Sequence, residues 1–208
     1  MQGPDTLACA IAEEQIVIVE GISDKLAIEA LVRRIGRDLD AERITVVPIG
    51  GAQAIRRFLV DLGPRRTEVR LAGLYDAGQE TEFRNAFWQL NLGASQTRAD
   101  LEGLGFFACE EDLEDELIRA VGPVRVQEIL EAHGDLRSFR TLQQQPAQRG
   151  RTTQQQLRRF MGAHAGHKAK YARILVDELD LDRVPRPLKG LLDYLFGRRH
   201  AEPSFDGP

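Results

Sequence analysis

The sequence has few cysteines and no long apolar run. Its two cysteines, Cys9 and Cys109, form neither a disulfide framework nor a zinc motif. No stretch of about 18 apolar residues predicts a membrane span, and the first residues lack the basic and then apolar pattern of a signal peptide. The phosphate-binding motif G-x-x-x-x-G-K-[ST] is also missing, which excludes an ATPase of that type within this sequence. We therefore expect a cytoplasmic protein that does not associate with membranes.

The composition is that of a globular protein. Hydrophobic residues make up 42% of the 208 residues, which is enough to form one core. Gly122-Pro123 marks a break, after which short helices alternate with polar linkers. We predict an α/β core at 1–121, a small helical insertion at 122–163, C-terminal helices that complete the core at 164–197, and a disordered tail at 198–208.

The segment around Glu20 is the most informative part of the chain. Four β-branched residues, Ile16 to Val19, predict a buried strand of a parallel sheet. Glu20 and a glycine end this strand, and a helix is predicted from Ser23 to Arg34 with Ser23 as its N-cap. Asp24 then lies in the first helical turn. Two carboxylates are thus expected at the carboxyl edge of the sheet, where ligands of open α/β sheets bind.

Carboxylates also follow later predicted strands. The segment 44–49 leads to Gly50-Gly51 and a helix, whereas 69–75 leads to Asp76. The strand at 105–109 is followed by six acids within 110–116. Parallel strands connected by helices end at one edge, so these acids are expected to converge there. Converging carboxylates repel one another unless a cation neutralises them, and oxygen ligands without Cys or His favour Mg²⁺, Mn²⁺ or Ca²⁺.

Plainer interpretations of these acids remain open. Acids near a helix N-terminus stabilise the helix through its dipole without binding anything. For Glu110, Glu111 and Asp115 we expect a solvent-exposed helix face, because Leu113, Leu117 and Ile118 give this segment an amphipathic pattern.

Two motifs, Val19-Glu20-Gly21-x-x-Asp24 and Leu74-Tyr75-Asp76, resemble those of Toprim domains. Asp112-Leu113-Glu114, Lys168 and the segment 179–188 extend the likeness to the Toprim region of the overcoming-lysogenization-defect (OLD) family nucleases. The resemblance spans about residues 15–196. It implies a Rossmann-like α/β fold, a mostly parallel four-stranded sheet flanked by helices. The ATPase region that precedes the Toprim part in OLD nucleases has no counterpart in this sequence.

The resemblance also implies metal-dependent cleavage of DNA by two ions, Mg²⁺ or Mn²⁺. Glu20, Asp24 and Asp76 resemble the ligands of one ion, and Asp112 and Glu114 those of the other. Lys168 resembles a lysine that stabilises charge at the reacting phosphate, so Glu20 and Lys168 are the catalytic candidates. The family's Asp-x-Asp pattern is here Asp76-Ala77-Gly78. A carboxylate from the next helical turn, Glu80 or Glu82, is expected to replace the missing acid.

Basic residues gather in a later segment. Between residues 149 and 173 there are seven Arg or Lys residues and no acid, although the whole chain has a net charge of −4. Such a segment is expected to contact a phosphate backbone, and its candidate nucleic-acid-binding residues are Arg151, Arg158, Arg159 and Lys170. A solvated basic helix face, or a partner for the acids at 110–116, explains the pattern equally well.

The sequence therefore predicts a divalent-metal-dependent DNA endonuclease or nickase. Because Gly78 replaces an acid, one alternative is a weakly active or non-catalytic Toprim module that works with a separate ATPase subunit. A second alternative is an RNA-processing Toprim nuclease, since these residues contact phosphate and carry no sugar preference. Assembly into a homo-oligomer is a further expectation.

Overall fold

The computed structural model describes residues 14–64, 68–93, 96–163 and 166–197. The predicted disordered tail at 198–208 lies outside these residues. Among the helices of the described segments, none combines the length and the apolar character needed to cross a membrane.

A four-stranded sheet forms the centre of the fold. The strands are β1 (Gln15–Val19), β2 (Ile44–Pro48), β3 (Arg70–Asp76) and β4 (Phe106–Cys109), and they are arranged in the order β2-β1-β3-β4. All three strand pairs are parallel. The predicted parallel α/β sheet is thus confirmed, and the carboxyl ends of the strands meet at one edge.

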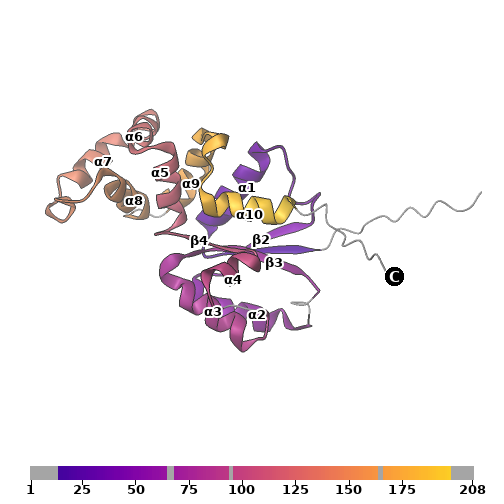
Figure 1. Cartoon of the computed structure of the whole chain (residues 1–208). Helices are drawn as coiled ribbons and strands as arrows, with labels where there is room; N and C mark the ends of the chain where they lie inside the picture. Colours follow the sequence, from indigo (N-terminus) through magenta and orange to yellow (C-terminus); the bar gives the residue numbers. More distant parts are fainter. Residues whose placement is uncertain (1–13, 65–67, 94–95, 164–165, 198–208) are drawn as a thin grey trace, which may run out of the picture.

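Helices cover both faces of this sheet (Figure 1). One face carries α1 (Ile22–Arg34), α5 (Leu113–Val121), α9 (His167–Glu178) and α10 (Arg186–Phe196). The other carries α2 (Ile55–Asp61), α3 (Glu80–Gln89) and α4 (Arg98–Gly103). Val17 and Val19 of β1 belong to the core of the first face and Ile16 and Ile18 to that of the second. Burial on both faces explains the uninterrupted β-branched run of β1.

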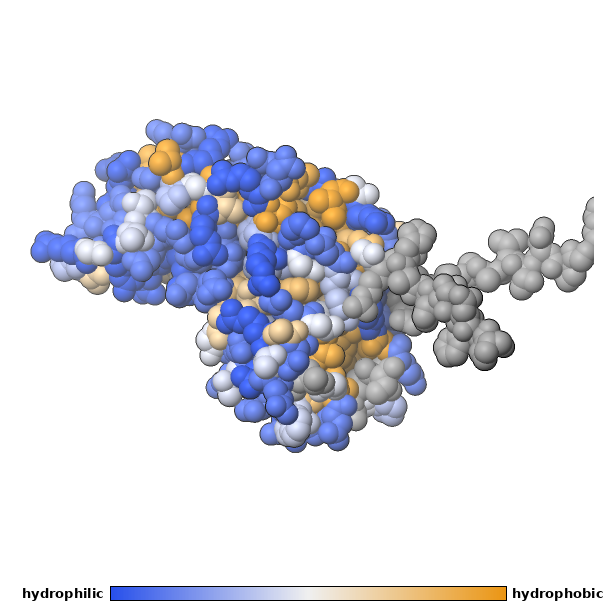
Figure 2. All heavy atoms as spheres, in the orientation of Figure 1, coloured by the Kyte–Doolittle hydropathy of each residue, from blue (hydrophilic) through white to orange (hydrophobic). Residues whose placement is uncertain are grey.

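Three further helices project beside the sheet (Figure 1). They are α6 (Pro123–Ala132), α7 (Leu136–Gln143) and α8 (Thr153–Ala163), called here the insertion helices. Phe139 of α7 packs edge-to-face on Phe160 of α8, with 5.6 Å between ring centroids. Both rings belong to the same apolar cluster as Leu31 of α1 and Leu175 of α9. This shared core fixes α8 relative to the sheet edge, whereas the visible surface of the insertion helices is largely hydrophilic (Figure 2).

Candidate metal and phosphate site

The turn from β1 into α1 fixes the first two carboxylates. The backbone of Gly21, at φ −137° and ψ 177°, is extended and forms the N-cap of α1. Its N–H donates to Asp24 Oδ2 at 2.9 Å, so Asp24 is held in the first helical turn beside Glu20. The prediction that Ser23 caps this helix is wrong, because the helix begins one residue earlier and Ser23 is buried.

Asp76 ends β3 at the same edge. A single 3₁₀ turn, Ala77–Gln79, separates it from α3. Gly78 is exposed, and the space that a side chain would occupy there is open. No side chain of the described residues therefore fills the place of the acid that the Toprim pattern has at this position.

The start of α5 supplies two more carboxylates. Asp112 is the N-cap, and its Oδ1 accepts the N–H of Asp115 at 2.8 Å. Glu114 is only 3% exposed. The prediction of a solvent-exposed Asp115 is wrong, because this residue is 5% exposed and accepts a hydrogen bond from Gln154 of α8 at 2.8 Å. The insertion helices cover this side of α5, which the amphipathic pattern alone does not reveal.

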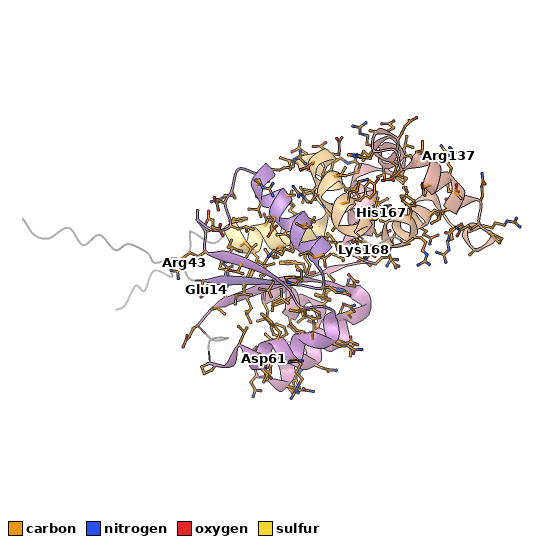
Figure 3. All side chains as sticks on the ribbon, turned by 180° about the vertical axis from the view of Figure 1, so that it is seen from behind. Glu14, Arg43, Asp61, Arg137, His167 and Lys168 are labelled. Carbon is orange, nitrogen blue, oxygen red and sulfur yellow. The ribbon has the colours of Figure 1, made fainter. Side chains whose placement is uncertain are left out.

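These acids line one pocket of about 360 Å³, called here the carboxylate pocket. Its charged lining residues are Glu20, Asp24, Asp76, Asp112, Glu114 and Lys168. Five of the six predicted metal ligands and both predicted catalytic residues are therefore brought together from β1, α1, β3, α5 and α9. Lys168 lies between the sheet and the insertion helices (Figure 3), and its ammonium group is 3.2 Å from Glu114 Oε2.

Glu80 is the predicted ligand that lies elsewhere. Its carboxylate is 2.9 Å from Arg98 Nε and 3.7 Å from Arg84 Nη1. Glu82 lies two positions further along α3, on another side of the helix, and shares a pocket with Glu20. These two acids and Gln79 line an adjoining pocket of about 300 Å³. Of the two acids considered as replacements for the missing one, Glu82 is thus the one beside the site.

Burial and mutual repulsion raise the pKa of two acids in the carboxylate pocket. Burial raises the pKa of Asp24 to about 7, assisted by the charge of Glu114 and opposed by the Gly21 hydrogen bond. Burial, together with the charges of Glu20 and Asp112, raises the pKa of Asp76 to about 7. Burial alone would lower the pKa of Lys168, but Glu114 outweighs it and the net shift is upward. Carboxylates of raised pKa that face one another are stabilised by an added cation.

The oxygen atoms of the pocket fit a hard divalent cation. Glu20 Oε2 and Glu114 Oε1 are buried and, within the described chain, accept no hydrogen bond. Unsatisfied buried carboxylate oxygens are costly, and they are the ligands that Mg²⁺ and Mn²⁺ prefer. As the side chains stand, no three Asp, Glu, His or Cys residues of the described segments form a ready-made cage for one ion. Internal cations and N–H donors hold several of the carboxylates instead.

A basic pocket of about 490 Å³ adjoins the carboxylate pocket. Arg151, Arg158, Arg159 and Lys168 contribute its positive charge, and it shares Asp112 and Lys168 with the carboxylate pocket. Lys170, also predicted to bind nucleic acid, instead forms an ion pair with Asp135 at 2.6 Å and is not among the lining residues of either pocket. Whether a residue of α9 faces a pocket or Asp135 depends on the rotation of this helix about its axis. The sequence alone did not determine that rotation.

The comparison with protein families identifies a match over the first part of the fold. Residues 13–75 match the family model described as overcoming lysogenization defect protein-like, TOPRIM domain. This match confirms the resemblance drawn from the motif of Glu20 and Asp24. Asp76, Asp112, Glu114 and Lys168 lie beyond the matched residues. No curated protein matches the sequence at a significant level.

Solved structures show the same fold over most of the chain. The C-terminal region of the Burkholderia pseudomallei OLD protein is similar, with a TM-score of 0.65 and 17% identity, over 89% of this chain and 97% of that one. For the C-terminal region of the Xanthomonas campestris pv. campestris OLD protein, phased with mercury, the TM-score is 0.64 and the identity 22%, over 87% and 93% of the two chains. The architecture is therefore that of an OLD-type Toprim region, including the helices after β4.

Proposed function

We propose that this OLD-like Toprim protein is a divalent-metal-dependent endonuclease or nickase that hydrolyses DNA phosphodiester bonds with two cations. The observation that carries the proposal is the convergence of five carboxylates and Lys168 in one pocket that opens beside a basic pocket. The OLD-like Toprim match supports a nuclease-type module in general. The choice of reaction, metal and substrate rests on the chemistry of these side chains.

Each group has a chemical role in this proposal. Glu20, Asp24 and Asp76 would hold one cation, and Asp112 and Glu114 the other. Two bound cations supply positive charge at the attacking and leaving oxygens of a phosphodiester. Glu20 would also orient the reacting water and accept its proton, because a carboxylate beside a cation site can do both.

Lys168 supplies charge that a carboxylate cannot. Its side chain is half-exposed at the junction of the two pockets, where a phosphate in the basic pocket would meet the carboxylate pocket. A lysine is a compact point charge suited to a non-bridging phosphoryl oxygen as negative charge develops there. The contact with Glu114 keeps the side chain extended toward this place.

The arginines of the basic pocket would bind the DNA backbone. Arg151 and Arg159 are exposed, and no acid of the described residues forms an ion pair with either of them. Phosphate contacts of this kind position a duplex or a single strand without reading its sequence. The expected substrate is therefore a nucleic acid that is bound through its phosphate backbone with little sequence preference.

The test is cleavage of supercoiled plasmid in Mn²⁺ or Mg²⁺, with labelled RNA of matched length alongside. We expect nicked or linear DNA from the wild type, and at least a hundredfold slower cleavage from Asp76→Ala and from Lys168→Met, the size of effect typical of lost charge stabilisation at a reacting group. Glu80→Gln is the matched control, since Glu80 pairs with Arg98 outside the pocket. Cleavage by Asp76→Ala at the wild-type rate would refute this site, and faster cleavage of RNA would reassign the substrate.

One observation favours a second candidate function. Gly78 leaves open space where the Toprim pattern has an acid, and Glu82, which borders the site, is exposed. A weakened site would suit a module with little activity of its own that works with a separate ATPase subunit. Plasmid left intact in both metals, together with recovery of an ATPase in a pull-down, would support this function over the first.

A further inference from the structure

Arg158 of α8 joins the insertion helices to the carboxylate pocket. Its Nε donates to Asp112 Oδ2 at 2.7 Å, and its Nη1 donates to Glu111 Oε2 at 2.8 Å. The Asp112 side chain is 12% exposed and the Arg158 side chain 35%, so the pair is partly buried. Arg158 thus places a positive charge on a proposed metal ligand.

Both oxygens of the Asp112 carboxylate already accept a hydrogen bond. Oδ1 accepts the N–H of Asp115 and caps α5. Oδ2, the other oxygen, is the one that Arg158 holds. A guanidinium group and a divalent cation on the same oxygen would repel each other at short range. Binding of a cation at Asp112 therefore opposes the contact with Arg158.

We propose that Arg158 couples cation binding to binding of nucleic-acid phosphate. Without metal, Arg158 neutralises Asp112 and is withheld from substrate. When a divalent cation neutralises Asp112 instead, the guanidinium group of Arg158 is released to bind phosphate in the basic pocket, which it already lines together with Arg151 and Arg159. The inference rests on the proposed function, because it takes Asp112 as a metal ligand.

The remaining contact of Arg158 is too weak to keep it in place. The Glu111 side chain is 63% exposed, so solvent and salt screen that ion pair. A phosphate in the basic pocket offers a guanidinium group two hydrogen bonds and a full charge. The same side chain thus serves as a substitute cation in one state and as a phosphate ligand in the other.

Calorimetric titration of the full chain with Mn²⁺, without DNA, tests the first half of the inference. Arg158→Gln removes the competing charge, so we expect the Kd for Mn²⁺ to fall about three- to tenfold. Arg125→Gln is the matched control, because Arg125 also bonds two carboxylates, those of Glu128 and Glu178. Its Kd for Mn²⁺ should stay at the wild-type value.

Binding of a short fluorescein-labelled duplex, measured in EDTA and in Ca²⁺, tests the second half. We expect wild-type affinity to rise in Ca²⁺ and this rise to shrink at least threefold in Arg158→Gln. Arg159→Gln should weaken binding by the same factor in both conditions. Melting temperatures in EDTA confirm that the variants fold, and Arg158→Lys, which keeps the charge, should lie between the wild type and Arg158→Gln.

The outcomes separate this inference from the proposed function. Wild-type protein that binds Mn²⁺ while Arg158→Gln shows the same Kd overturns the inference alone. An equal rise in DNA affinity for both proteins also overturns it. Wild-type protein without any Mn²⁺ binding overturns both the metal site and the coupling built on it.

Discussion

At the scale of single residues, the carboxylate pocket is an arrangement of acids whose charges are only partly balanced. Asp24 is held by one backbone N–H, Glu114 by Lys168 and Asp112 by Arg158. No side chain of the described residues donates a hydrogen bond to Asp76, at the end of β3, and this carboxylate faces several like charges. In the metal-free protein, Asp76 thus bears a charge cost that no hydrogen bond from the described residues offsets.

Asp76→Asn should stabilise the metal-free protein at neutral and higher pH. The pKa of Asp76 is about 7 in the folded chain and near the ordinary 3.8 when unfolded. Folding thus opposes its ionisation, and this cost is absent below about pH 4, grows as pH rises and is complete above about pH 7. Because Asp76 is partly exposed, we expect about 1 kcal/mol, or roughly 2–4 °C in Tm, at pH 8 in EDTA.

The melting temperature as a function of pH checks this prediction. The gain should disappear near pH 4, and Mn²⁺ should stabilise the wild type more than Asp76→Asn. Asp61→Asn is the control for loss of one negative charge, since Asp61 lies on the far side of the sheet from Lys168 (Figure 3) and its ion pair with Arg57 is exposed. A variant that is less stable than wild type at pH 8 contradicts the prediction.

At the scale of elements, the close approach of β1 and β3 positions Glu20 and Asp76. Gly73 lies in β3 opposite Ile18, and a side-chain carbon there would meet the Ile18 carbonyl oxygen and the ring of Phe106. Gly73→Ala should therefore cost about 2 kcal/mol or more, because backbone atoms cannot move aside as side chains can. Urea unfolding measures it, with Gly103→Ala, which has open space, as the control.

The strands were predictable because each is a short apolar run that ends in a turn or an acid. Because β1 is buried on both faces, its apolar residues do not alternate with polar ones. This uninterrupted apolar run predicts a strand of a parallel sheet. Helix α4 was missed, since it has six residues and its signal is the capping pair of Thr97 and Asp100. Convergence of Glu20, Asp76 and Asp112 followed from topology alone, because parallel strands share one carboxyl edge.

Side-chain partners could not be predicted in the same way. Arg158 meets Asp112 across 46 positions of sequence, and Lys170 meets Asp135 across 35. Such pairs depend on how the insertion helices dock, which the shared apolar core decides. The choice between Glu80 and Glu82 depends on one 3₁₀ turn before α3. Spacing gave the candidates, and only tertiary packing distinguished between them.

At the scale of the whole molecule, charge is divided between two regions. Residues 136–176 contain nine of the 28 Lys and Arg residues and none of the 32 Asp and Glu residues. This segment includes α7, α8 and most of α9, with Arg137 on the outer part of the insertion helices (Figure 3). An acidic protein thus presents a positively charged surface, formed by this segment, beside its carboxylate pocket. A polyanion would be steered toward that surface.

The salt dependence of DNA binding tests this division of charge. We expect log Kd to rise linearly with log salt concentration in EDTA, with a slope lowered by about one for each phosphate-binding arginine removed, as in Arg151→Gln. Arg186→Gln is the control, because Arg186 pairs with Glu102 and lies outside the basic segment. Fluorescence anisotropy over a salt series gives both slopes. An equal loss of slope in the two variants would mean that DNA is attracted by the average charge of the protein and that the insertion helices do not form its binding surface.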